Sequence, residues 1–126
     1  MLNFRLRLLK DSGQIGEKTF EQLNRFVPFL EERTGIVLTE DNAAMLITHF
    51  AIALERACRD EPVNAMEKGT LSQVTASHCY PQAESLLEAW TNSDNLPVFH
   101  DNERDFLLLH LCVLLASPKP QNENKK

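Results

Sequence analysis

The pattern of apolar and polar positions is clearest between Thr39 and Cys58, where it predicts a helix that is buried on one face. The apolar residues recur at a period of 3.6 and share one stripe: Leu46, Phe50, Ala53, Leu54 and Ala57. Thr39 can accept a hydrogen bond from the first-turn backbone N–H groups, and the two acidic residues after it suit the positive end of the helix dipole. His49 and Arg56 lie on one line beside the apolar stripe. We therefore expect both side chains where the core meets whatever covers that edge.

Other segments have helical spacing as well, and they cover 17–34, 71–78, 81–90 and 101–116. The first contains Pro28, which should bend it, and is followed by Gly35, a residue suited to a left-handed helix end. The last is almost wholly apolar from Phe106 to Ala116, which is typical of a helix in a central position. The sequence therefore predicts an all-α fold, a compact bundle of about five helices.

The two ends of the chain have different patterns. Leu2, Phe4, Leu6 and Leu8 alternate with polar residues at a strand-like period, but no second such segment could pair with them. A short helix and an arm that docks on another copy both remain open. We assign 1–16 to an N-terminal arm and 17–116 to one helical domain. Residues 117–126 have two prolines and no apolar anchor, so we expect a disordered tail.

Composition narrows the classes of protein. The 126 residues suit a single domain, and 13 basic against 18 acidic side chains give a net charge of −5, which argues against direct nucleic-acid binding. No apolar run approaches the roughly 18 residues that span a bilayer, and there is no secretory signal pattern. The three cysteines lack C-x-x-C spacing and are expected to be reduced core thiols: Cys58, Cys79 and Cys112. These observations predict a cytoplasmic protein with no metal, no cofactor and no membrane contact.

His110 interrupts the apolar last helix and therefore needs a partner, since an unpaired buried polar ring costs about 1–3 kcal/mol. Glu103 lies about two turns earlier on the same face. The ring could be a buried neutral histidine satisfied by a carbonyl, or it could handle protons or act as a nucleophile. His49 has the same two interpretations. The other two histidines lie near helix ends or loops and are expected on the surface: His78 and His100.

Several motifs together resemble one known family. The segment LEERTGIVLTEDNAAMLITHFAIALER resembles the start of the PTS regulation domain (PRD), where a glycine turn precedes a helix with a histidine and, seven residues later, an arginine. Here these are His49 and Arg56. The segments YPQAESLLEAW and LPVFHDNERDFLLLHL resemble the family's tyrosine-proline helix, its leucine-proline loop and a glutamate seven residues before a second histidine. Here these are Glu103 and His110, and the resemblance covers about 20–115.

The resemblance implies a five-helix regulatory module that is not an enzyme and is commonly dimeric. In that family both histidines accept phosphoryl groups from the histidine phosphocarrier protein or from a sugar-specific enzyme IIB. His49 and His110 would be the acceptors here, with Arg56 and Glu103 as supporting residues. Such modules usually occur in tandem behind an RNA- or DNA-binding domain, whereas this chain holds one module and no segment expected to house an output domain. The resemblance therefore implies indirect action, on transcription or on a partner protein.

Two other functions remain open at this stage. The chain could be a helical dimerisation or interaction protein without phosphorylation. It could also be a small hydrolase or transferase that uses His110 with Glu103.

Overall fold

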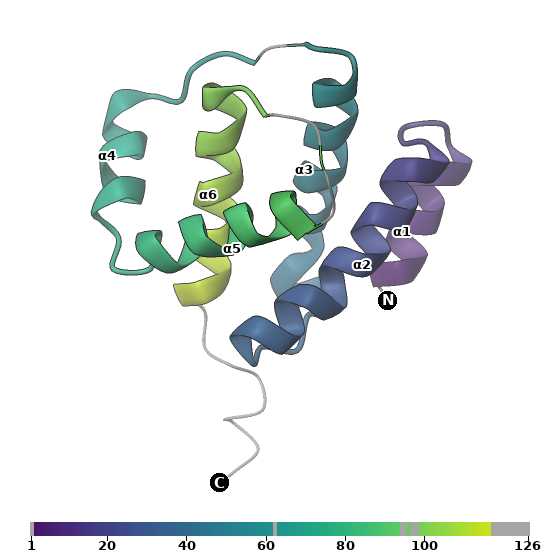
Figure 1. Ribbon diagram of the computed structural model, residues 1–126, viewed down its shortest axis with the longest axis horizontal. Helices are drawn as coiled ribbons and strands as arrows, with labels where there is room; N and C mark the ends of the chain where they lie inside the picture. Colours follow the sequence, from purple (N-terminus) through teal and green to yellow (C-terminus); the bar gives the residue numbers. More distant parts are fainter. Residues whose placement is uncertain (1, 62, 94–95, 97–98, 117–126) are drawn as a thin grey trace, which may run out of the picture.

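The computed structural model describes residues 2–61, 63–93, 96 and 99–116, and within them the fold is helical without strands (Figure 1). The all-α prediction is thus confirmed. The described part of the chain forms six helices: α1 (Leu2–Asp11), α2 (Glu17–Thr34), α3 (Glu40–Cys58), α4 (Lys68–Ala76), α5 (Tyr80–Ser93) and α6 (Asp101–Ala116). The expected disordered tail, 117–126, lies outside the described residues.

Helices α3 and α6 pack against each other in the middle of the molecule. Helices α1 and α2 cover α3 on one side, while α4 and α5 contact α6 on the other (Figure 1). A buried aromatic cluster joins α2, α3 and α5, because the Phe26 ring lies 4.0 Å from the Trp90 ring and 4.8 Å from the Phe50 ring, measured between centroids. The core therefore has α3 at its centre.

The boundaries of α2 and α3 follow from local hydrogen bonding. Gly35 takes the left-handed conformation, with φ 73°, and its N–H donates to the carbonyl of Glu31 at the end of α2. At the start of α3, the N–H of Asn42 donates to Oγ1 of Thr39 at 3.3 Å, and the N–H of Thr39 donates to Oδ1 of Asn42 at 2.8 Å. This reciprocal pair is a capping box, so both predicted helix ends are confirmed.

The N-terminal segment is helical despite its alternating pattern, and this accounts for the sixth helix. Leu6 is fully buried and Leu9 packs against the core, while Phe4 and Leu8 are exposed. Arg5 also fastens α1 to α3, because its Nη2 lies 2.7 Å from Oε1 of Glu40. Of the two alternatives for this segment, the structure has the short helix, and that helix lies against α2 and α3.

The prediction for the cysteines is corrected at one position. Cys79 and Cys112 are buried, but Cys58 is exposed. Cys58 is the last residue of α3, and burial along the helix falls from Leu54 to the exposed residues that follow it. None of the helices in the described part of the chain combines the length and apolar character that a membrane span requires.

The capping box predicts a measurable contribution to stability. Thr39→Ala removes the acceptor for a backbone N–H of α3 and should lower the free energy of unfolding by about 1 kcal/mol. Thr75→Ala, at an exposed position within α4, is the matched control and should change it by less than about 0.5 kcal/mol. Urea unfolding at neutral pH measures both, and equal effects of the two substitutions would contradict this role of Thr39.

Candidate functional site

Two contacts between α3 and α6 define the candidate site. His49 lies opposite His110, and Arg56 lies opposite Glu103. Numbering rises from the first contact to the second on α3 and falls on α6, so the two helices run antiparallel. The contacts are seven residues apart on each helix, which places them two turns, or roughly 10 Å, from each other. All four residues singled out from the sequence thus meet along one helix interface.

The two imidazole rings of the histidine pair are stacked. Their centroids are 4.3 Å apart, and the ring planes differ by 22°. Both side chains are partly buried, and among the described residues neither ring has a hydrogen-bond partner. The hydrogen-bond partner expected for His110 is thus absent among the described residues: the ring is only partly buried, and it stacks on His49 without a bond to a carbonyl or to Glu103.

The environment of His110 keeps its ring neutral. Burial, and secondarily the neighbouring His49, lower the pKa of His110 from 6.5 to about 4. Both causes disfavour the charged imidazolium. At neutral pH this ring consequently presents an unprotonated nitrogen, whose lone pair is available to an electrophile.

Arg56 and Glu103 form a bidentate ion pair. Nε and Nη2 of Arg56 donate to the two carboxylate oxygens of Glu103 at 2.9 and 3.0 Å, so both oxygens are engaged. Glu103 is only 4% exposed and lies in the first turn of α6, where the helix dipole favours a negative charge. Arg56 is therefore not merely a solvated charge at a helix end, because it compensates a buried carboxylate.

A hollow of about 260 Å³ extends from His49 to the Arg56–Glu103 ion pair. It is lined by His49, Arg56, Val63, Asn64, Glu103, Phe106 and Leu107. The two bonds to Glu103 leave the Nη1 amino group of Arg56 for another acceptor. The hollow thus offers a ring nitrogen, a guanidinium and an amide within a mainly apolar wall.

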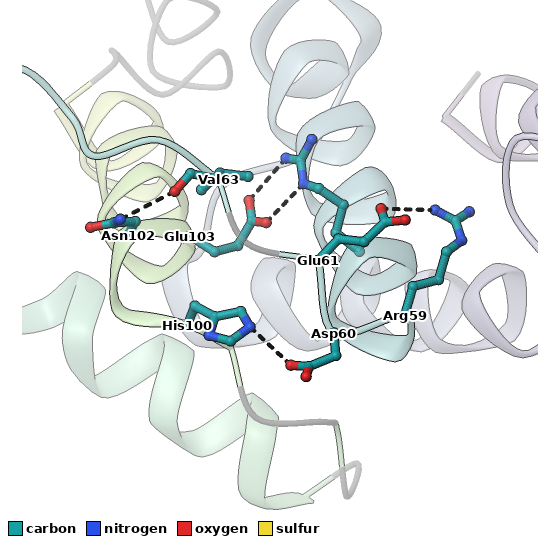
Figure 2. Close-up of polar contacts among 8 residues, drawn as sticks. Arg59, Asp60, Glu61, Val63, His100, Asn102 and Glu103 are labelled. Atoms are coloured by element: carbon teal, nitrogen blue, oxygen red, sulfur yellow. Dashed lines mark hydrogen bonds and ion pairs between the residues drawn. The ribbon is translucent and has the colours of Figure 1, made fainter.

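The connection between α3 and α4 contributes residues that sequence reasoning missed. Asn102 donates from Nδ2 to the carbonyl of Val63 at 3.1 Å, and Nε2 of His100 lies 3.1 Å from Oδ1 of Asp60 (Figure 2). These contacts hold the connection beside the start of α6, and Asp60 takes a left-handed φ of 57° there. No local sequence signal marks these pairs, because both depend on where α6 begins.

The two histidines outside the α3–α6 contact lie at the surface. His78 and His100 are exposed, as expected. Within the described residues, no group of three or more His, Cys, Asp or Glu side chains is arranged to hold a metal ion.

Comparison with known proteins gave no match to a protein-family model, a curated protein sequence or a solved structure.

The ion pair leads to a stability prediction with an internal control. Arg56→Ala leaves Glu103 buried without its cation and should lower the free energy of unfolding by about 2 kcal/mol. Arg5→Ala removes a similar bidentate partner from Glu40, but those side chains are 38% and 34% exposed, so its cost should stay below about 1 kcal/mol. Chemical unfolding of both variants measures the difference, and an Arg5→Ala cost equal to or above that of Arg56→Ala would contradict this assignment.

The lowered pKa of His110 predicts a pH dependence. Between about pH 6.5 and pH 4 the unfolded chain binds a proton at His110 that the folded chain does not bind, so stability falls as the pH falls. In the wild type, His110 should account for a loss on the order of 2 kcal/mol in the free energy of unfolding over this pH window. The His110→Gln variant should lack this loss. His78→Gln, at an exposed ring, should leave the loss in place. Urea unfolding at a series of pH values tests this, and identical pH profiles for the wild type and His110→Gln would refute it.

Proposed function

We propose that this chain is a regulatory module of the bacterial sugar phosphotransferase system, without enzymatic activity of its own. His49 and His110 accept phosphoryl groups from the phosphocarrier protein or from an enzyme IIB. The observation that supports this most is the contact between the two rings that the family resemblance singles out, at a partly exposed edge.

Transfer of a phosphoryl group from a phosphohistidine requires few catalytic groups on the accepting protein. The lone pair of one imidazole nitrogen forms a P–N bond while the P–N bond of the donor's phosphohistidine breaks, and the acceptor's ring proton leaves to the donor ring. Because the phosphoryl group arrives already activated, the acceptor has mainly to hold its ring in position. Packing of His49 and His110 against each other provides that position.

Phosphorylation would change the balance of charge at the interface. It adds about 1.5 to 2 negative charges beside the apolar wall of the hollow, where Arg56 is already bound to Glu103. A phosphoryl group on His49 therefore competes with Glu103 for the guanidinium or else separates α3 from α6. If Arg56 exchanges partners, Glu103 is left buried and uncompensated, which is costly. Altered α3–α6 packing is then the signal that a partner protein, or a second copy in a homodimer, receives.

A second candidate is a helical interaction protein that is not phosphorylated. It is favoured by Met45 and Val113, which are exposed apolar side chains one turn beyond His49 and His110 on the same two helices. The hydrolase alternative loses support, since both oxygens of Glu103 are bound to Arg56 and neither is bonded to His110.

The test is transfer from a phosphorylated donor. We expect phosphocarrier protein or enzyme IIB domains to label His49 and His110 with acid-labile phosphate, faster at His49, because His110 lies in the apolar helix. His49→Gln and His110→Gln should each lose one labelled site, whereas His78→Gln and His100→Gln, at exposed rings, should lose none. Mass spectrometry maps the label. Absence of label on both residues from every donor would favour the interaction protein, and label confined to His78 or His100 would show that the acceptors are misassigned.

A further inference from the structure

We infer that His49 and His110 form a single-occupancy acceptor, in which a phosphoryl group on either ring opposes addition of a second one to the other ring. The identity of the protein donor rests on the proposed function. The coupling between the two rings rests on their geometry alone and can be tested without that donor.

The space around the two stacked rings limits how many phosphoryl groups the pair can carry. With centroids 4.3 Å apart and planes within 22° of parallel, the rings leave no layer between their faces for water or for a tetrahedral phosphoryl group. Because the lone pair of an imidazole nitrogen lies in the ring plane, a phosphoryl group projects from a ring edge, and a second one would project from an edge of the other ring in the stack. Two such groups on rings this close crowd each other, and separation of the stack would relieve the crowding.

Repulsion between negative charges also opposes a second phosphoryl group. Each phosphoryl group carries about −1.5 to −2 at neutral pH, and like charges at this separation in a partly buried site repel strongly. Among the described residues that line the hollow, Arg56 is the only cationic side chain, and Glu103 holds it through both carboxylate oxygens. One phosphoryl group could be compensated if Glu103 gave up the guanidinium. Among the described lining residues no second cation is left to compensate another group.

The consequence is a choice between two modified states. The ring that reacts first determines which helix carries the negative charge, α3 for His49 and α6 for His110. Two donors that prefer different histidines would then compete for one module. The helix that carries the negative charge would depend on which donor reacted first. A pair of independent histidines would instead add their signals.

Phosphoramidate tests this directly, since this small donor phosphorylates histidine without a partner protein. The lone pair of the ring nitrogen forms the new P–N bond, the P–N bond of phosphoramidate breaks, and ammonia leaves with the ring proton. His78→Gln/His100→Gln is the background, so that only the pair is counted. Adding either His49→Gln or His110→Gln to this background variant leaves a single acceptor histidine. Circular dichroism verifies that these variants are helical.

Intact-protein mass spectrometry should show that each single-acceptor variant takes up one phosphoryl group. With both acceptors present, the second addition should be slower than the first by roughly tenfold or more. In concentrated urea the same chain should take up two groups at independent rates, because unfolding removes the stack. If the single-acceptor variants prove misfolded, His49→Asn and His110→Asn replace them.

Two results would overturn the inference, and a third would separate it from the proposed function. Doubly phosphorylated folded protein at the level expected from the product of the two single occupancies would overturn the inference. So would failure of the folded pair to react at all while the unfolded chain reacts. Labelling by phosphoramidate with the expected coupling, but by no protein donor, would defeat the proposed function and leave the coupling intact.

Discussion

The bidentate contact between Arg56 and Glu103 is the interaction that fixes the α3–α6 interface. Burying a carboxylate to 4% exposure is costly unless a cation accompanies it, and the guanidinium of Arg56 engages both oxygens of Glu103. Because a bidentate pair is directional, it also sets the register in which the two antiparallel helices meet. Two turns away, the same register brings His49 against His110. The histidine contact is thus a consequence of helix packing that a buried charge holds in place.

This arrangement makes the interface responsive to charge. Burial keeps His110 neutral where it packs against His49, and Arg56, the cation that lines the hollow beside His49, is already bound to Glu103. A small anionic group added at either ring must therefore recruit Arg56 or move the helices apart. Both responses would alter the packing of α3 against α6, and a change in helix packing is a route by which a local modification can have a distant effect.

Sequence reasoning reached the fold where local chemistry determined the structure. The ends of α2 and α3 could be predicted because Gly35 and Thr39 act within their own turns. At the N-terminus, alternation over four apolar residues was compatible with a strand, a helix or an arm, and only burial of Leu6 against α2 and α3 decided it. The exposure of Cys58 likewise depends on where the neighbouring elements stop, which a helical period does not reveal.

The candidate site was predictable in its residues but not in its pairing. Spacing along α3 and α6, together with the family resemblance, picked out all four residues: His49, Arg56, Glu103 and His110. Helical projection placed Glu103 on the same line as His110 and suggested that they interact, yet side chains two turns apart on one helix are too far from each other to do so. The partner of each comes from α3, and the register between two helices distant in sequence is a tertiary property.

The most direct test of this account is whether the two rings touch in solution. Nuclear Overhauser spectroscopy at neutral pH, with the four histidines assigned by single substitutions, measures contacts between ring protons. We predict a cross-peak between the ring protons of His49 and His110. Ring protons of His49 and His110 that show cross-peaks only to residues of their own helices would contradict the account.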